Sequence, residues 1–379
     1  MIQNLLSFFT ALFISLMCFP PFIKFLEKKK FLDSGGGRKI HKGYTAHMGG
    51  LVIFFAFALS ASVWFSVANQ GISWNLMRIM LVLFLVVLLG IRDDLNSLTP
   101  TVKVLCEIFL GILCCYFEVR LKSFYGFLGI YELPVAVSYL LTISFIVVVM
   151  NSYNLIDGID GQAGLQAVLF FTFILMIHLL HGRSWESLVC SSMMGAIVGF
   201  LYYNWQPARV FMGDTGSLFI GFTIAMISIA TMNFLGAKSG DDFFARPVLH
   251  INVTLQIPAI KSALCLPIAF FFVPLADTLR VFSYRISKKR SPFLPDKKHI
   301  HHLLLSVGCN NRQCSTITSV LSLSISLCST LLSFVLTDIY FSIYLVILFF
   351  AYVFGLHLFI RRRIQTAPHQ HQIISKKNR

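Results

Sequence analysis

The chain has 379 residues, of which 56% are apolar and only 12% are charged, and its mean hydropathy is +0.77. A soluble domain carries about 25% charged residues, so this composition excludes a soluble fold, and it equally excludes a disordered, collagen-like or coiled-coil chain. The net charge of +15 would suggest nucleic acid as the partner of a soluble protein, but in a membrane protein it indicates basic cytoplasmic loops beside anionic lipid.

Eleven apolar segments approach the length of a membrane-spanning helix, about 17–25 residues. In chain order they are 5–26, 50–69, 75–91, 104–119, 134–150, 163–181, 187–203, 217–235, 262–283, 315–337 and 339–360. The first is not a secretory signal peptide, because no basic residue precedes Lys24. The last two are separated so briefly, by Thr337 and Asp338, that they predict a tight hairpin. We therefore expect an all-α polytopic membrane protein.

The distribution of lysine and arginine predicts the orientation. With the N-terminus outside, 24 of the 31 basic residues fall on the inner side of the membrane and 7 on the outer side. This bias follows the positive-inside rule, and the loss of one span would invert part of it. We expect a single transmembrane domain over residues 1–363, followed by a polar cytoplasmic tail over residues 364–379. The nine cysteines are scattered through apolar segments and predict no disulfide framework.

Three inner loops, 90–98, 151–161 and 207–217, contain carboxylates, Asn and Gly where basic residues are expected. Carboxylates that cluster on a basic face repel one another unless a cation holds them. Asp93 and Asp94 alone are typical of a solvated helix end. As neighbours on a helix they would point in different directions, so one could bind a metal or position a lysine while the other faces a substrate.

The second loop places Asn154, Asp157 and Asp160 at a spacing of three. On a helix they would share one stripe about 60° wide, while Gly158 and Gly161 permit a broken helix. The alternative is a loop rich in turn-forming residues.

The third loop leads from Gly213 into an apolar helix. Asp214 or Thr215 could simply cap that helix, and a helix N-terminus of this composition is also a ready anion site.

His299, His301 and His302 lie within four residues of one another and raise the question of a zinc site. No clear third or fourth ligand follows at zinc-site spacing, so a phosphate-rich ligand is favoured. Arg38 and Lys42 lie in a Gly-rich basic loop, which is either a phosphate clamp or an ordinary positive-inside loop.

Taken in chain order, these segments resemble the polyprenyl-phosphate N-acetylhexosamine-1-phosphate transferase family, membrane enzymes that begin polymer assembly on a lipid carrier. The matching segments are Arg38-Lys39-x-His41-x-Gly43 with Gly49-Gly50, Gly90-x-x-Asp93-Asp94, residues 151–161, residues 211–218, Pro274-Leu275-x-Asp277 and Asp296-x-x-His299-Ile300-His301-His302. Eleven spans and the His-Ile-His-His form resemble the branch that uses UDP-N-acetylglucosamine or a similar UDP-sugar. Ala46 and Gln162 depart from the family pattern, in which Pro and Leu are usual.

The resemblance implies an enzyme of the bacterial inner membrane whose active site faces the cytoplasm. It would transfer a sugar-1-phosphate, with N-acetylglucosamine-1-phosphate as the expected group, from a UDP-sugar to undecaprenyl phosphate. UMP is released, and the lipid-linked sugar starts a cell-envelope polysaccharide such as O-antigen. The implied partners are these two substrates and membrane lipids, with no nucleic acid, and a homodimer is implied by analogy with the wider superfamily.

The resemblance also implies roles for individual residues, with Mg²⁺ as the cofactor and Mn²⁺ as its substitute. Asp214 would be the main metal ligand, with Asn154 beside it. Asp93 or Asp94 would deprotonate or orient the lipid phosphate. The remaining candidates are Asp157 and Asp160 at the nucleotide, His299, His301 and His302 at the diphosphate or sugar, and Arg38 and Lys42 at phosphate.

Two other readings stay open at this point. An ion-coupled transporter would also place acids and broken helices in a membrane, although near the middle of the bilayer and usually in inverted repeats, and no repeat is visible here. The second is an inactive scaffold protein in a polymer-assembly complex.

Overall fold

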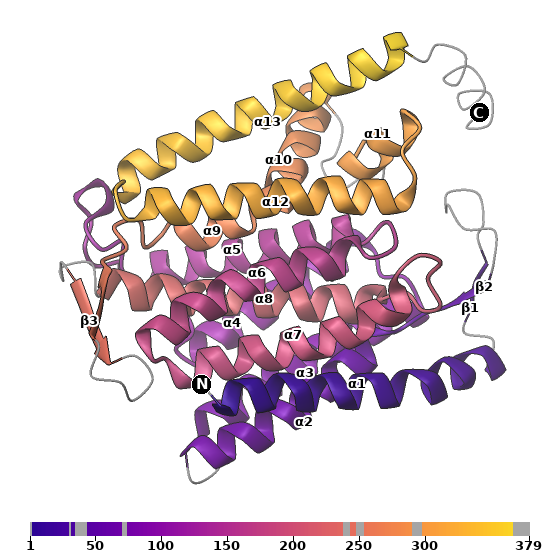
Figure 1. Cartoon of the computed structure of the whole chain (residues 1–379), viewed down its shortest axis with the longest axis horizontal. Coiled ribbons are helices and arrows are strands. Elements are labelled where there is room, and N and C mark those ends of the chain that lie inside the picture. Colours follow the sequence, from indigo (N-terminus) through magenta and orange to yellow (C-terminus); the bar gives the residue numbers. More distant parts are fainter. Residues whose placement is uncertain are drawn as a thin grey trace.

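The computed structural model describes residues 2–29, 32–34, 44–69, 74–237, 243–247, 254–289 and 298–366. Over these residues the chain is mainly helical (Figure 1). The elements are α1 (Ile2–Lys28), β1 (Leu32–Ser34), β2 (Tyr44–Ala46), α2 (Gly50–Asn69), α3 (Trp74–Leu95), α4 (Pro100–Tyr116), η1 (Phe127–Gly129), α5 (Val135–Ile156), α6 (Gln162–His181), α7 (Ser184–Asn204), α8 (Gly213–Ala237), β3 (Phe243–Pro247), β4 (Thr254–Pro258), α9 (Leu266–Phe270), α10 (Phe272–Ser287), α11 (Ile300–Ser306), α12 (Asn311–Ser333) and α13 (Asp338–Thr366).

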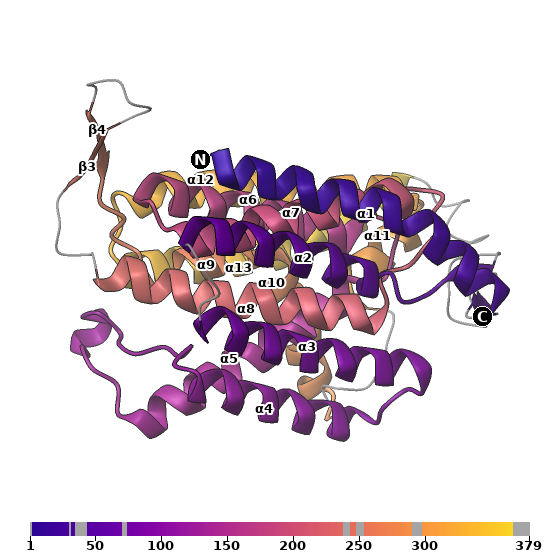
Figure 2. The same cartoon turned by 90° about the horizontal axis from the view of Figure 1, so that it is seen from below.

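The long helices lie side by side, and the chain runs back and forth along them (Figures 1 and 2). This path brings the last turns of α3 and α5 to the same end of the bundle as the first turns of α4 and α8. The short helix α11 and the end of α13 lie at that end too, whereas the β3–β4 hairpin projects from the opposite end. Three motif loops that are far apart in the sequence therefore meet.

Helix α8 is the centre of the bundle. In its most apolar stretch 83% of the residues are buried, against 6% for the peripheral helix α13. Helices in lipid approach closely where small residues face the partner, and α8 offers Gly216 and Gly221 in this way. A Cβ on Gly221 would lie 3.0 Å from the Met150 Cα of α5. Apolar residues all around α8 thus fit a helix that is surrounded by others.

Eight helices in the described part of the chain are long and apolar enough to cross a membrane, namely α1, α2, α5, α6, α7, α8, α12 and α13. The multi-pass prediction is therefore confirmed. Two of the other expected spans are short for local reasons, since α4 has only 17 residues and the span expected over 262–283 is divided at Phe271 into α9 and α10. Helix α3 has 22 residues and ends in the charged turn of Arg92, Asp93 and Asp94.

The all-α expectation holds for the bundle, and two short antiparallel hairpins lie in segments that connect its helices. β1 pairs with β2 and β3 pairs with β4, with Leu32 opposite Ala46 and Phe243 opposite Pro258. The tight hairpin expected between the last two spans is present, since α12 ends at Ser333 and α13 begins at Asp338. The Asp338 carboxylate accepts two backbone N–H groups just before α9, at 3.0 Å each, which fixes this hairpin against the bundle.

Candidate active site

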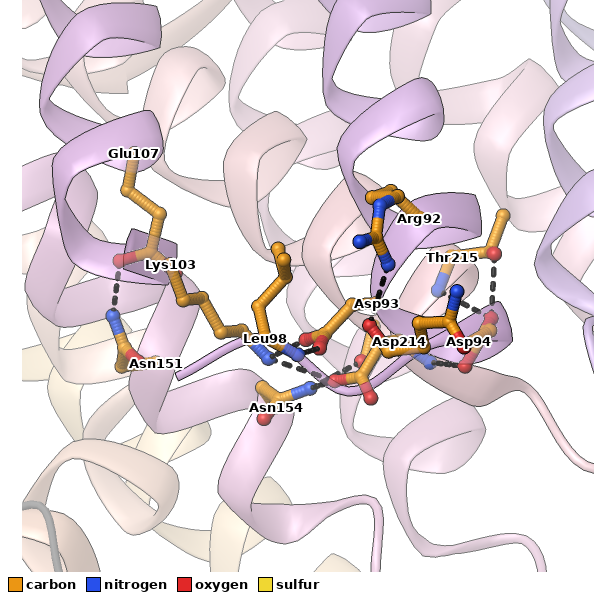
Figure 3. Close-up of polar contacts among 12 residues, drawn as sticks. Arg92, Asp93, Asp94, Leu98, Lys103, Glu107, Asn151, Asn154, Asp214 and Thr215 are labelled. Atoms are coloured by element: carbon orange, nitrogen blue, oxygen red, sulfur yellow. Dashed lines mark hydrogen bonds and ion pairs between the residues drawn. The ribbon is translucent and has the colours of Figure 1, made fainter. Parts of the chain in front are cut away.

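Four helix ends bring the acidic motifs together (Figure 3). Asp93 and Asp94 lie in the last turn of α3, Lys103 in the first turn of α4, Asn154 in the last turn of α5 and Asp214 in the first turn of α8. The contacts among them join residues up to 120 positions apart in the sequence. The fold therefore assembles one polar cluster from three separate inner loops.

Asp94 caps the start of α8. Its Oδ1 accepts the backbone N–H of Asp214 at 2.7 Å, and its Oδ2 accepts the backbone N–H of Thr215 at 2.9 Å together with the Thr215 hydroxyl. A carboxylate in this place pairs amides that the helix leaves unpaired and faces the positive end of the helix dipole. Gly213 permits the approach with its φ of +74°, because a Cβ there would lie 2.7 Å from Asp94 Oδ2. The cap of α8 thus comes from α3.

Asp93 has a different partner. Its Oδ2 lies 2.8 Å from the Nζ of Lys103, and its Oδ1 accepts the backbone N–H of Leu98 at 2.7 Å. The Lys103 ammonium is also 2.8 Å from Asp214 Oδ1, so it bridges two carboxylates. The two adjacent acids therefore point to different partners, as neighbours on a helix predict.

Asp214 is more accessible than Asp93 and Lys103. Its side chain is 34% exposed, whereas Asp93 is 6% exposed overall. Besides Lys103, its Oδ1 accepts a hydrogen bond from the Nδ2 of Asn154, which also donates to the Ser217 hydroxyl at 2.7 Å. The Asp214 carboxylate is thus held by α4 and α5 together while one side stays open.

Asn154, Asp157 and Asp160 do not share one helical stripe, because α5 ends at Ile156. Asp157 follows the helix, and Asp160 is buried and accepts the backbone N–H of Ala208 at 3.3 Å. Burial, and then repulsion by Asp214, Asp94 and Asp160, raise the pKa of Asp157 to about 7. Three carboxylates close to Asp157 thus add their repulsion to the effect of burial.

The histidine segment packs on the turn that follows α5. The Asp277 carboxylate accepts from the His299 ring at 2.9 Å and from the Ile300 backbone N–H at 3.1 Å, which fixes the start of α11. His301 lies against Gly158, where a Cβ would come within 2.4 Å of its ring Nε2. The His302 ring lies 4.3 Å from that of His301. The structure thus brings His301 against the 157–161 turn, with the rings of His299 and His302 beside its own.

The His301 imidazole is neutral. Burial, and then the neighbouring His302 and His299, lower its pKa to about 3, and the Asp277 carboxylate opposes this only in part. Its ring Nδ1 and the Nε2 of His299 are buried and without a hydrogen-bond partner among the described residues. Two buried ring nitrogens near this turn are therefore left without a protein partner among the described residues.

Two sequence candidates, Arg38 and Lys42, lie outside the described residues. Conversely, sequence reasoning overlooked Lys103 and Glu107, both on α4. Glu107 is fully buried and accepts a hydrogen bond from Asn151 of α5. The signal was a pair of opposite charges four residues apart at the inner end of an otherwise apolar segment.

The donors present fit a magnesium ion that is completed by a substrate. Among the residues that the structure describes, no three His, Cys, Asp or Glu side chains are arranged as a ready-made metal site. Mg²⁺ prefers hard oxygen ligands and is commonly held by one or two protein groups together with water and phosphate oxygens. The open carboxylate of Asp214 beside the Asn154 amide supplies donors of this kind, in a cluster whose carboxylates repel one another.

Comparison with known proteins places this cluster in a family. The sequence pattern of glycosyl transferase family 4 matches residues 76–232, a range that contains all five side chains of the cluster. A probable undecaprenyl-phosphate N-acetylglucosaminyl 1-phosphate transferase of Bacillus subtilis is 31% identical over 82% of this chain and 80% of its own length. A decaprenyl-phosphate N-acetylglucosaminephosphotransferase of Mycobacterium tuberculosis is 30% identical over 73% and 69%. An Escherichia coli undecaprenyl-phosphate alpha-N-acetylglucosaminyl 1-phosphate transferase is 27% identical over 82% and 80%.

Proposed function

The chain belongs to glycosyl transferase family 4, among the polyprenyl-phosphate N-acetylhexosamine-1-phosphate transferases, and from this premise we propose that it transfers N-acetylglucosamine-1-phosphate from UDP-N-acetylglucosamine to polyprenyl phosphate. An oxygen of the lipid phosphate attacks the β-phosphorus of the UDP-sugar. The bond from that phosphorus to the bridging oxygen breaks, and UMP leaves with the electron pair. The observation that carries the proposal is the convergence of Asp93, Lys103, Asn154 and Asp214 at one end of the bundle.

The chain's own groups act mainly by position and charge, as phosphoryl transfer requires. A phosphate monoester has a second pKa near 6, so the lipid phosphate is largely dianionic at pH 7 and needs orientation more than deprotonation. Asp94 holds α8 in place through its three hydrogen bonds, and Asp93 holds the Lys103 ammonium. Lys103 in turn offers positive charge to the phosphates at the mouth of the site.

Mg²⁺ is the proposed cofactor, with Mn²⁺ as its substitute, and Asp214 and Asn154 are the proposed ligands. Bound there, the ion would offset the charge of the diphosphate. The 157–161 turn and the histidines beside it form the proposed binding region for the nucleotide and sugar. Asp157 and Asp160 belong to that turn, His301 lies against its Gly158, and the rings of His299 and His302 lie beside that of His301.

The proposed topology has eleven spans, with α3, α4 and the broken pair α9–α10 crossing the membrane beside the eight longer helices. The N-terminus lies outside, and the aspartate end of the bundle faces the cytoplasm of a bacterial inner membrane. Support comes from the back-and-forth path of the chain and from the 24 basic residues on the proposed inner side. The acids gather at helix ends rather than in mid-helix, so we do not propose the ion-coupled transporter.

This function can be tested by measuring UMP release. The purified protein is mixed with polyprenyl phosphate, Mg²⁺ and each of a panel of UDP-sugars. We expect turnover with UDP-N-acetylglucosamine and a metal dependence that Asp214→Asn abolishes, because the variant removes the only charged group among the two proposed ligands. Stability should change little, since Asp94 rather than Asp214 caps α8. Turnover only with another UDP-N-acetylhexosamine would keep the reaction but assign a different sugar donor. No UMP with any of these sugars would contradict the proposed reaction.

A further inference from the structure

Glu107 is a buried carboxylate next to the proposed site with one oxygen to spare. The residue is 0% exposed, and its Oε2 accepts a hydrogen bond from the Nδ2 of Asn151. Its Oε1 is buried without a hydrogen-bond partner among the described residues. Such a group is costly to bury, so its spare oxygen calls for a partner that this state of the protein does not supply.

Lys103 precedes Glu107 by one helical turn on α4 and shares its face of the helix. In Figure 3 its side chain extends toward Asp93 and Asp214, while Glu107 stands farther from them on the same helix. The Lys103 side chain is 14% exposed, and its ammonium lies 2.8 Å from one oxygen of each aspartate. A lysine ends in a compact ammonium on a flexible four-carbon stem, so it can move between carboxylates on either side.

A divalent cation on Asp214 would compete with this ammonium. Lys103 contacts Asp214 through Oδ1, which also accepts from Asn154, the second proposed ligand. Two cations that share one carboxylate oxygen repel each other strongly in a partly buried site. Lys103 therefore gives up Asp214, which leaves Asp93 as its remaining carboxylate. The spare oxygen of Glu107, one helical turn along α4, offers the ammonium a second carboxylate in this partly buried place.

We propose that Glu107 is a positioning residue that receives the Lys103 ammonium when a divalent cation binds Asp214. This inference rests on the proposed function. In the metal-free state Lys103 offsets the repulsion between Asp93 and Asp214. In the metal-bound state Glu107 holds Lys103 charged and within a side chain's reach of the phosphates. The purely structural alternative is that Glu107 only ties α4 to α5 through Asn151.

Mn²⁺ binding distinguishes the proposed role of Glu107 from the purely structural one. It is measured by electron paramagnetic resonance on the full chain in detergent, without substrate. Glu107→Gln keeps an acceptor for Asn151 and removes the carboxylate. We expect it to weaken Mn²⁺ binding about tenfold, the effect of losing one charged hydrogen bond. Lys103→Met should tighten Mn²⁺ binding, because the competing ammonium is gone.

The double variant decides the mechanism. In the Lys103→Met background, Glu107→Gln should leave Mn²⁺ affinity unchanged, since no ammonium needs a new partner. An equal weakening in both backgrounds would show that Glu107 acts only through its charge, and no weakening in either would show a structural tie; each result overturns the inference. If Glu107→Gln fails to fold, Glu107→Asp carries the same cycle, because its shorter carboxylate should no longer meet the ammonium.

Two controls keep this result apart from the proposed function. Glu118→Gln removes an equal charge from a side chain that is 66% exposed and pairs with Lys122 just beyond α4, and it should leave Mn²⁺ binding unchanged. Asp214→Asn should abolish binding. If Mn²⁺ still binds to Asp214→Asn with the affinity of the unmodified chain, the metal assignment itself is wrong, whatever Glu107→Gln does.

Discussion

Asp93 and Asp94 share a peptide bond but are held by different helices. Asp94 bonds the first amides of α8, and Asp93 bonds Lys103 of α4. Each carboxylate accepts from more than one donor, so each anchors a contact that its neighbour cannot replace. The pair therefore joins three helices at a single point in the sequence.

Replacing each aspartate by asparagine should separate these roles. In Asp94→Asn the amide NH₂ faces donors of Asp214 and Thr215, so we expect unfolding to become easier by about 1–2 kcal/mol. Asp93→Asn still accepts from Leu98 but loses its charge toward Lys103, so stability should fall less while UMP release falls strongly. Thermal unfolding in detergent and UMP release measure the two effects. Equal loss of stability in both variants would refute this division.

His301 should make stability depend on pH. Its pKa is about 3 in the folded protein, against about 6.5 for an unperturbed histidine. As the pH falls from 6.5 toward 3, the unfolded chain binds a proton at this residue and the folded chain does not. The folded state therefore loses up to about 1.4 kcal/mol per pH unit in that window and nothing above it.

His301→Gln should flatten this pH dependence. Unfolding temperatures at pH 7.5, 6.5 and 5.5 should fall less steeply for the variant than for the unmodified chain. The comparison must be made with His299, His302 and Asp277 intact, because these groups face His301. The same slope in both proteins would mean that folding does not lower the pKa of His301.

At the scale of the elements, glycines set how closely α2 and α3 approach α8. A Cβ on Gly90 of α3 would lie 2.4 Å from the Thr215 Cα, and one on Gly50 of α2 would lie 2.1 Å from the Gly216 nitrogen. Both obstacles are backbone atoms, which cannot rotate away. The start of α8 is therefore fixed by contacts with two preceding helices.

Gly90→Ala should push α3 away from α8. We expect a loss of about 1–3 kcal/mol of stability from overpacking, and reduced UMP release because Asp94 loses its short bonds to α8. Gly355→Ala on α13 is the matched control, since a Cβ there meets nothing within 4 Å. Alanine favours a helix over glycine by up to about 1 kcal/mol, so the control should be neutral or slightly stabilising. Similar losses in both variants would argue against the close-approach explanation.

The sequence predicted the helices well because a membrane demands long apolar segments. It predicted poorly where a helix stops inside such a segment. Helix α5 ends at Ile156, which removes Asp157 and Asp160 from the expected stripe, and Phe271 divides a span that hydropathy reads as continuous. These ends depend on which groups cap them in three dimensions.

The sequence predicted only part of the candidate site. Asp93, Asp94, Asn154 and Asp214 stood out as acids and an amide at inner loops, and the structure does bring them together. Lys103 resembled an ordinary positive-inside charge, because its partner Asp214 lies 111 residues away. Only the packing of α4 beside α5 and α8 shows that this lysine belongs to the site.

For the whole molecule, the topology gives a prediction about sidedness. Ser97 is exposed at the aspartate end of the bundle, and Glu132 is exposed at the opposite end, just before α5. In intact cells a membrane-impermeant thiol reagent should label Glu132→Cys and spare Ser97→Cys, with the unmodified chain as the background for native cysteines. Labelling of Ser97→Cys from outside would contradict the proposed orientation and place the aspartate end on the outer side of the membrane.

The central position of α8 has a consequence for how the protein is made. Asn154 leaves the ribosome 60 residues before Asp214, a delay of about 3–12 s at 5–20 residues per second. Asp93 and Lys103 belong to consecutive helices and can pair as soon as α4 is inserted. Asp94 has to wait, because its donors lie on α8. We therefore expect a nascent chain that stops before residue 213 to have formed the Asp93–Lys103 pair already. The complete cluster forms only when α8 inserts between the helices that precede it.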